Sequence, residues 1–324
     1  MRKPHTRRHG EDAQSTPFTQ MRADVLHGLE QYPRRLPSKY LYDGRGSALF
    51  EHITHQPEYY PTRTELALLR AHAASIARWV GPRLHMVELG SGDGRKTALL
   101  LNALDDPVAY TPVEISRTAL QGSILRLRAA LPDVEMLPLC ADFTQPLALP
   151  KPQRAPQRRL LFFPGATLGN FMRGDAVALM RLMHHAMGPD GMALIGVDLH
   201  KEPAMIEAAY NDAAGAVAAL SLNLLRRLNR ELGSDFDLHG FAHRACYHAS
   251  TRRIEGELVS LRAQNVCIGA HRFAFDNGQA INVFYSHKYS EAEFATMAEM
   301  ANLRICADWC ATGPAFGLYL LRRA

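Results

Sequence analysis

The chain has 324 residues, of which 47% are hydrophobic and 21% charged, and this composition excludes a mainly disordered, collagen-like or coiled-coil protein. The formal net charge is +5, and the first ten residues, MRKPHTRRHG, carry four of the basic side chains. The remainder is therefore nearly neutral, which makes nucleic acid an unexpected partner.

The basic start is not followed by the apolar segment of a secretory signal, and no apolar run approaches the ~20 residues that a membrane span needs. We therefore expect a cytoplasmic protein without a membrane partner, in which residues 1–17 form a disordered basic tail. The five cysteines form no CxxC pair, so neither a disulfide framework nor a zinc site is expected.

The middle of the chain alternates apolar runs with helical stretches, a pattern typical of a parallel sheet wrapped by helices. The predicted strands cover residues 84–89, 108–115, 134–140, 160–165 and 192–199. Two later β-like runs, 303–309 and 315–321, flank Gly313 and Pro314 and predict an antiparallel hairpin at the sheet edge. The fold class is α/β, with a doubly wound, Rossmann-like sheet.

Between residues 199 and 290 the pattern changes. Pro203 begins an alanine-rich helical region that extends to about residue 232, and the alternating segments 253–268 and 272–285 predict further strands. We expect this insertion to pair with the N-terminal segment around residues 37–64. The predicted division is a second, α+β domain of residues 18–64 and 200–290, beside a sheet domain of residues 65–199 and 291–324.

The most informative local motif is HMVELGSGDGRKT, residues 85–97, in which an apolar strand runs through Gly90, Gly92 and Gly94 into a leucine-rich helix. Glycines let a backbone turn sharply and approach a ligand closely. A dinucleotide-binding loop places its third glycine five residues after the first, whereas Gly94 follows Gly90 by four. Glu88, just before the loop, would repel a pyrophosphate but suits a cation such as S-adenosylmethionine.

Acidic residues also stand at the next two strand ends. Glu114 closes the second strand, where a carboxylate can accept hydrogen bonds from both ribose hydroxyls of a nucleoside. Asp142 and Phe143 follow the third strand, where an adenine could be hydrogen-bonded and stacked. Three consecutive strand ends thus converge on one crevice and predict a site for S-adenosylmethionine, with nicotinamide binding as the alternative.

The segment YLYDGRGSALFEHITHQPEYYPTRTE, residues 40–65, resembles the N-terminal hallmark of the histidine-specific, S-adenosylmethionine-dependent N-alpha-methyltransferases of ergothioneine biosynthesis. The resemblance continues through VELGSGDGRKT, FPGATLGNF, DLHKEPAMIEAAYNDAAG and LNRELGSDFDL, and covers nearly the whole chain after the tail. It implies a class I methyltransferase domain with a second, substrate-binding domain, a monomer, an amino acid as the small-molecule partner and S-adenosylhomocysteine as a product.

The resemblance also implies roles for individual residues. Together with the glycine loop, it gives a cofactor-binding set of Glu88, Gly90, Gly92, Lys96, Glu114, Asp142 and Phe143, in which Glu114 replaces a more common aspartate. The residues that match those around the substrate's α-amino and carboxylate groups are Tyr42, Tyr59, Asn170 and Tyr210. Tyr42 is the candidate catalytic residue, because it could orient the attacking amine directly or through a water.

The side-chain pocket departs from the family pattern. Ser286 is kept, but Phe284 stands where the family has a glutamate that grips the imidazole of histidine. Gly256 stands where a methionine is common. These two changes predict a roomier, more apolar pocket for an aromatic amino acid such as tryptophan or tyrosine, unless Tyr285 or His287 replaces the missing imidazole contact.

The implied reaction is in-line displacement, in which the α-nitrogen takes the methyl group from the sulfonium, repeated up to the trimethyl betaine. Two alternatives stay open, a non-catalytic binder of the cofactor and amino acid, and a methyltransferase for a peptide or another side-chain nitrogen. No metal is expected, because neither His184 with His185 nor His5 with His9 has a carboxylate or cysteine that completes a ligand set.

Overall fold

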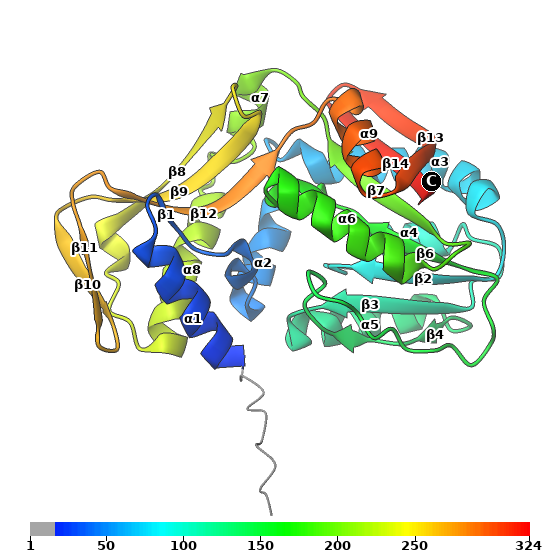
Figure 1. The fold of residues 1–324 in the computed structure, drawn as a ribbon, viewed down its shortest axis with the longest axis horizontal. Helices are drawn as coiled ribbons and strands as arrows, with labels where there is room; N and C mark the ends of the chain where they lie inside the picture. The colour runs from blue at the N-terminus through cyan, green and yellow to red at the C-terminus, as the bar shows by residue number, and fades with distance from the viewer. Residues whose placement is uncertain (1–16) are drawn as a thin grey trace, which may run out of the picture.

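The computed structural model describes residues 17–324, which form a large and a small β-sheet region side by side (Figure 1). We refer to residues 60–198 and 289–324 as the large-sheet region and to residues 17–59 and 199–288 as the small-sheet region. The expected basic tail lies outside the described residues except for Pro17, which begins the first helix. No helix in residues 17–324 is long and apolar enough to cross a membrane.

The large sheet has eight strands in the order β13-β14-β7-β6-β2-β3-β4, with β5 also paired to β3. The central strands are parallel, and the hairpin β13–β14 joins β7 in antiparallel pairing. The strands are β2 (Leu84–Leu89), β3 (Ala109–Glu114), β4 (Glu135–Met136), β5 (Leu139–Cys140), β6 (Arg158–Phe163), β7 (Met192–Asp198), β13 (Leu303–Thr312) and β14 (Ala315–Arg323). This confirms the predicted doubly wound sheet with its terminal hairpin, the arrangement of a class I methyltransferase.

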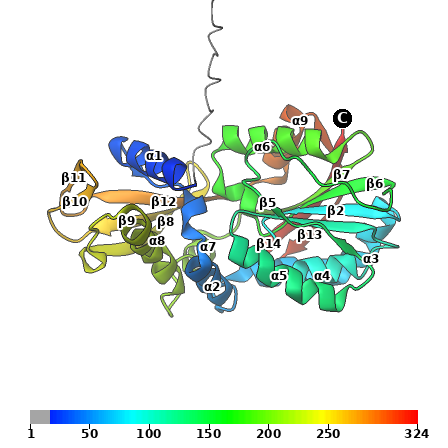
Figure 2. The same cartoon turned by 90° about the horizontal axis from the view of Figure 1, so that it is seen from below.

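Helices cover both faces of the large sheet, α6 and α9 on one side and α3, α4 and α5 on the other (Figure 2). Their bounds are α3 (Tyr60–Val80), α4 (Arg95–Leu101), α5 (Arg117–Ala130), α6 (Arg173–Met187) and α9 (Glu291–Met300). Successive side chains of a strand point to opposite faces, so Phe162 of β6 packs into one core and Phe163 into the other. A sheet buried on both faces requires the nearly continuous apolar runs seen in its strands.

The third predicted strand, residues 134–140, is instead two short strands, β4 and β5, that both pair with β3. The break falls at Leu137 and Pro138, and proline has no N–H to contribute to a ladder. The short β5 leaves the chain free to turn toward the crevice at residue 141.

The small sheet has the order β1-β12-β9-β8, and a separate hairpin, β10–β11, lies at its end. The strands are β1 (Arg34–Arg35), β8 (Phe241–His248), β9 (Arg253–Ser260), β10 (Gln264–Ile268), β11 (His271–Phe275) and β12 (Ala280–His287). β9 and β10 fall within the predicted segment 253–268, and β11 and β12 overlap the predicted segment 272–285 but extend one and two residues beyond it, whereas β8 was not predicted. Every strand of this sheet except β1 comes from the insertion after β7.

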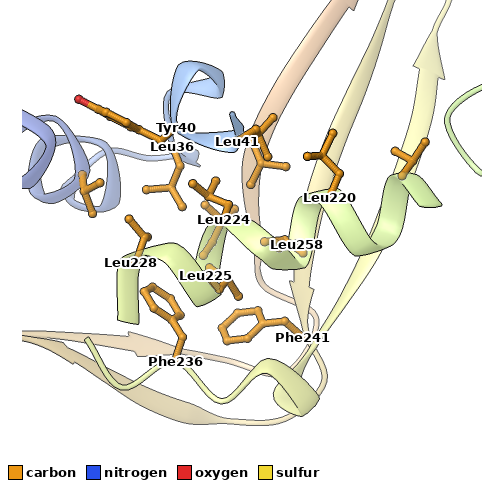
Figure 3. Packing of buried hydrophobic residues seen from close by; sticks show 14 of the residues in the cluster. Leu36, Tyr40, Leu41, Leu220, Leu224, Leu225, Leu228, Phe236, Phe241 and Leu258 are labelled. Atoms are coloured by element: carbon orange, nitrogen blue, oxygen red, sulfur yellow. The ribbon is translucent and has the colours of Figure 1, made fainter. Parts of the chain in front are cut away.

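The helices of this region are α1 (Pro17–Glu30), η1 (Ser38–Leu41), α2 (Gly44–Ile53), α7 (Pro203–Ala208), α8 (Ala216–Leu232) and η3 (Leu238–Gly240). Leu220, Leu224 and Leu228 recur every four residues and so form one apolar face of α8. This face packs between the sheet and the N-terminal segment (Figure 3). Polar contacts add to the packing, since the Asp43 carboxylate accepts hydrogen bonds from Asn223 at 2.9 Å and Arg230 at 2.7 Å.

The chain passes between the two regions at three places: at Tyr59 and Tyr60, after Asp198, and after Lys288. The second and third connections run side by side, because Leu199 and Tyr289 form a parallel bridge. The amide of Tyr289 donates to the Asp198 carbonyl at 3.1 Å. All three connections therefore border the space between the two sheets.

Candidate active site

A cavity of about 840 Å³ opens between the two regions, within the range of ~300–1,000 Å³ typical of small-molecule sites. One wall consists of the carboxyl ends of the large-sheet strands β2, β3, β5 and β6, and the other of segments around η1, α2, α8 and β12. The predicted site residues that line the cavity are Tyr42, Tyr59, Glu88, Gly90, Gly92, Lys96, Glu114, Asp142, Phe143, Asn170, Tyr210, Phe284 and Ser286. Gly256 does not line it.

The glycine loop turns the backbone from β2 into α4 beneath the cavity. Gly90, Gly92 and Gly94 have φ angles of +79°, +52° and +79°, a left-handed conformation that strains any residue with a Cβ. Gly94 is the N-cap of α4. The loop therefore brings peptide N–H groups and the start of a helix close to the space that a ligand would fill.

Glu88 lies at the carboxyl end of β2 and is almost completely buried. Its Oε2 atom accepts a hydrogen bond from Thr97 Oγ1 at 2.6 Å and another from the Tyr110 hydroxyl. Burial raises the pKa of Glu88 to about 8, even though both hydrogen bonds lower it. A cation in the cavity would favour the ionised carboxylate, so this position suits a positively charged ligand.

Glu114 is the last residue of β3, and its side chain points to the same cavity. Its Oε1 atom accepts the backbone N–H of Ser116 at 3.1 Å. Burial raises the pKa of this carboxyl group, and the backbone bonds at Ser116 and Ile115 lower it. The arrangement holds the carboxylate at the strand end, where it can accept hydrogen bonds from the hydroxyls of a ribose.

The third strand end contributes Asp142 and Phe143. The Asp142 carboxylate accepts hydrogen bonds from the Thr144 N–H at 2.9 Å and the Thr144 hydroxyl at 2.6 Å. The ring of Phe143 packs edge-on against Phe163, with centroids 5.5 Å apart, and against Phe171. A flat apolar ring beside a fixed carboxylate is a chemically suitable wall for an adenine base.

Lys96 does not face the cavity as a free cation, because it forms an ion pair with Glu65 of α3. Glu65 is fully buried and also accepts the N–H of Gly165, at 3.0 and 2.8 Å from its two oxygens. A Cβ on Gly196 would lie 2.1 Å from Glu65 Oε1, so a glycine in β7 makes room for this carboxylate. The sequence analysis did not identify Glu65 as a site residue. The available signal was an acidic residue on the buried face of a long helix.

The large-sheet wall fits S-adenosylmethionine. Glu88 suits a positive charge, Glu114 can hold two hydroxyls, and Asp142 with Phe143 can hold an aromatic base. The glycine loop leaves the backbone open between them. These groups match the sulfonium, ribose and adenine parts of that molecule in the order in which the strands end.

The opposite wall is a row of aromatic rings. Tyr42 packs edge-on against Phe50 at 5.7 Å between centroids, Phe50 against Tyr59 at 6.2 Å, and Tyr59 against Tyr210 at 6.1 Å. The row continues from Tyr210 to Phe284 at 5.9 Å. Its members come from three parts of the chain, residues 42–59, Tyr210 and Phe284, and the first three pairs pack edge-to-face.

Tyr42 has the properties of a neutral hydrogen-bonding group. Burial raises the pKa of Tyr42 to about 12, and the neighbouring Tyr210 and Glu114 add to this effect. The phenol therefore keeps its proton over the whole neutral range and is unsuited to act as a base. It can donate one hydrogen bond and accept others.

Asn170 stands at the end of the short helix η2 (Thr167–Asn170), which packs on the end of β12. The contact is close, because a Cβ on Gly169 would lie 2.7 Å from the His287 carbonyl oxygen. The Asn170 side chain lines the cavity and has no hydrogen-bond partner among residues 17–324. Its amide is therefore available to a ligand.

The structure differs from the prediction that Gly256 widens the substrate pocket. Gly256 pairs with Phe284 across β9 and β12, and a Cβ on Gly256 would lie 2.1 Å from Phe284 Cζ. The glycine thus accommodates the Phe284 ring, which also stacks on His243 with centroids 6.2 Å apart. The two departures from the family pattern therefore belong together. The Phe284 ring fills the space that Gly256 leaves, so Gly256 does not enlarge the pocket.

The two proposed substitutes for the missing glutamate also differ in position. Tyr285 lines the cavity, and the Arg253 guanidinium lies over its ring at 4.5 Å. His287 is buried away from the cavity, where its Nδ1 atom is 3.0 Å from the Gly169 carbonyl oxygen. Of the two, only Tyr285 can reach a ligand.

A buried charged cluster behind Ser286 was missed from the sequence. Lys288 has no exposed surface, and its Nζ atom lies 2.7 Å from Asp198 Oδ2, 2.8 Å from Ser286 Oγ and 3.0 Å from the Tyr210 hydroxyl. Asp198 also forms an ion pair with Lys201 and accepts a hydrogen bond from Tyr60 at 2.8 Å. The available signal was a charged residue at the end of each of two apolar strands, Asp198 at the end of β7 and Lys288 directly after β12. Sequence alone could not show that these two residues meet.

Within residues 17–324, no group of three or more His, Cys, Asp and Glu side chains is arranged to hold a metal ion. His184 instead receives a hydrogen bond from Arg323 at 2.9 Å. His5 and His9 lie outside the described residues.

Comparison with known proteins identifies the family. The family model for histidine-specific, S-adenosylmethionine-dependent methyltransferases matches residues 21–323. The chain is 35% identical to the histidine N-alpha-methyltransferase of Mycolicibacterium smegmatis over 310 residues, 94% of this chain and 95% of that protein. It is 34% identical to the enzyme of the same name from Mycobacterium tuberculosis, over 93% of this chain and 94% of that one.

A fungal relative, ergothioneine biosynthesis protein 1 of Neurospora crassa, is 30% identical over 90% of this chain and 33% of its own length. The family match extends from the second turn of α1 to the last strand of the large sheet, and so includes both walls of the cavity. The chain therefore belongs to the family of histidine-specific, S-adenosylmethionine-dependent methyltransferases.

Proposed function

We propose that this protein methylates the α-amino group of free L-histidine. The observation that carries the proposal is the single cavity whose acidic strand ends suit a nucleoside with a positive charge, and whose aromatic wall suits an amino acid. Family membership and relatives that bear the name histidine N-alpha-methyltransferase support the same reaction.

We further propose the cofactor set Glu88, Gly90, Gly92, Lys96, Glu114, Asp142 and Phe143, and the substrate set Tyr42, Tyr59, Asn170, Tyr210, Phe284 and Ser286. When bound, S-adenosylmethionine supplies a methyl group on a positively charged sulfur. Glu88 neutralises positive charge near the glycine loop, and Glu114 holds the ribose. Lys96, fixed by Glu65, acts by keeping the loops after β2 and β6 in place.

On the amino-acid side, the chain has to hold a neutral amine in line with the methyl group. The Tyr42 hydroxyl oxygen accepts a hydrogen bond from the amine and keeps its own proton, since the pKa of Tyr42 is raised to about 12. The amine proton therefore leaves to solvent before the reaction and not to Tyr42. Asn170, with no partner in the described chain, supplies a second contact to the amino-acid head group.

The assignment of roles has a counterpart in a division of the chain into two domains. We propose that residues 18–64 and 200–290 form the substrate-binding domain, and that residues 65–199 and 291–324 form the cofactor-binding domain. The cavity takes one wall from each, so neither domain alone would hold both reactants.

The test is to incubate the purified protein with S-adenosylmethionine and each of the twenty amino acids, and to identify products by mass spectrometry. We expect methylated histidine, ending at the trimethyl betaine, and a clear preference for histidine when tryptophan and tyrosine compete. Preference for tryptophan or tyrosine would contradict histidine as the substrate and assign the change to Phe284. Cofactor binding without any methylated product would contradict catalysis and favour a binding protein.

A further inference from the structure

The charged cluster behind the substrate wall has more positive than negative charge. Lys288 and Lys201 both contact Asp198, so two ammonium groups and one carboxylate leave one net positive charge. Burial alone would raise the pKa of Asp198, but the two lysines outweigh burial and hold the pKa below its usual range. Burial would likewise lower the pKa of Lys288, but Asp198 and the hydroxyl of Tyr210 raise it. Burial and the neighbouring Lys288 lower the pKa of Lys201, and the ion pair with Asp198 opposes that shift, so Lys288 is the cation whose charge the cluster favours most.

The hydrogen bonds of Lys288 fix the direction of two cavity hydroxyls. An ammonium group has three protons and no acceptor, and its Nζ atom has three partners: Asp198, Ser286 and Tyr210. Ser286 and Tyr210 must therefore both accept a hydrogen bond from Lys288. Their oxygens are also 2.7 Å apart, so one of the two hydroxyls donates to the other.

One proton of this pair remains unused, because each hydroxyl has a single proton and only one is spent on the mutual bond. Ser286 and Tyr210 both line the cavity, whereas Lys288 is completely buried behind them. The pair consequently offers the cavity one hydroxyl donor with a cation directly behind it. Such a donor favours an anionic oxygen, since hydrogen bonds that involve ionised groups are the stronger ones.

We propose that Lys288 is a positioning residue that recognises the carboxylate of the amino acid substrate through the hydroxyls of Tyr210 and Ser286. A free amino acid has one group that this arrangement attracts, the carboxylate, and one that it repels, the α-ammonium. The same charge thus favours the neutral amine that the reaction needs. The inference rests on the proposed function only in that the substrate is a free amino acid.

The experiment compares L-histidine with L-histidinamide, which has the same amine and imidazole but no negative charge at the carboxyl end. The quantity measured is the ratio of kcat/KM for the acid to kcat/KM for the amide, in the wild type and in Lys288→Met. The two substrates differ in amine pKa, but that difference cancels when the ratios of two enzymes are compared. We expect the ratio to fall on the order of tenfold in Lys288→Met, mainly through KM for histidine.

Two lysine variants serve as controls. Lys201→Met removes a charge from the same Asp198 without touching either cavity hydroxyl, so we expect a smaller fall in the ratio. Lys288→Arg keeps the charge, so the preference for the acid should survive even if overall activity drops. Equal falls in Lys288→Met and Lys201→Met would overturn the assignment to Lys288, as would a parallel loss for acid and amide.

If Lys288→Met fails to fold, Tyr210→Phe and Ser286→Ala carry the test, because they remove the hydroxyls and leave the ion pair intact. Unchanged ratios in both would overturn the inference. Calorimetric titration of the wild type with acid and amide adds a readout without turnover, in which equal affinity, or binding of neither, would also overturn it. If tryptophan replaces histidine as the substrate, the same ratio is measured with tryptophan and tryptophanamide, so failure of the proposed function stays distinguishable.

Discussion

The large-sheet wall of the cavity and the small-sheet wall differ in how their polar groups are supplied and in the charge behind them. The large-sheet wall takes Glu88, Glu114 and Asp142 from consecutive strand ends, so sequence order equals spatial order. The small-sheet wall takes its rings from three distant parts of the chain, with Lys288 behind them. One wall is acidic and the other is backed by net positive charge, which suits a cationic methyl donor facing an anionic amino acid.

The largest effect on the acidic wall is expected from removal of the Glu114 carboxylate. In Glu114→Ala, we expect the affinity for S-adenosylhomocysteine to fall about a hundredfold, since two hydrogen bonds to an ionised group are lost. Isothermal titration calorimetry measures this. Asp133→Ala, which removes an exposed carboxylate before β4, is the matched control and should bind normally. Similar affinities in the two variants would contradict a ribose role for Glu114.

The packing of the small-sheet wall can be tested at the contact between Gly256 and Phe284. In Gly256→Ala, the new Cβ would meet the Phe284 ring, so we expect a loss of about 1–3 kcal/mol in the free energy of unfolding by urea. The cost should shrink when Phe284 is also changed to Leu, because the clash is removed. Gly174→Ala, on α6 with nothing within 4 Å, is the control and should not lower stability, because alanine is the better helix former. Additive effects of the two substitutions would exclude the proposed pairing.

The charge of the acidic wall should make the affinity for S-adenosylmethionine depend on pH. Because the raised pKa of Glu88, about 8, means that a bound cation displaces a proton, affinity for S-adenosylmethionine should rise about tenfold between pH 7 and pH 9. The sign follows from linkage, since the ligand favours the ionised form that higher pH also favours. S-adenosylhomocysteine, without the sulfonium charge, should respond less, and Glu88→Gln should abolish the difference. A flat profile for both ligands would argue against Glu88 as a partner of the sulfonium.

The smallest effect is expected for the Tyr42 hydroxyl. In Tyr42→Phe, we predict a fall of about fivefold in kcat, the scale of one neutral hydrogen bond. Because the pKa of Tyr42 is about 12, the ionisation seen in the pH profile of kcat/KM between pH 6 and 10 should stay in place. A basic limb that disappears in the variant would instead assign proton transfer to Tyr42.

Much of the acidic wall could be predicted from the sequence. Apolar runs locate the strands, and parallel strands bring their carboxyl ends to one edge, so Glu88, Glu114 and Asp142 had to meet. The same reasoning could not find Glu65, whose partner Lys96 lies 31 residues away on another helix. The hydrophobic pattern of a helix predicts which face is buried, but it does not predict which buried acidic residue forms an ion pair.

The aromatic wall was accessible mainly through family resemblance. Tyr59, Tyr210 and Phe284 meet only after β12 pairs with β9 and α8 packs on the N-terminal segment. The prediction that Gly256 widens the pocket was wrong for the same reason. The effect of Gly256 depends on Phe284, the residue opposite it in the neighbouring strand. Lys288 and Asp198 were missed for the same reason, as the contact between them joins two separate connections of the chain.

The Asp198 cluster also stands where the chain crosses between the two sheets. Tyr60, Asp198 with Lys201, and Lys288 each lie at a different one of the three crossings. Contacts elsewhere between the regions, such as Lys39 to Asp142 at 3.5 Å and Arg95 to Thr54 at 3.1 Å, are side-chain contacts that can separate without moving a covalent connection. The cluster therefore ties the three covalent connections between the regions together at one edge of the cavity.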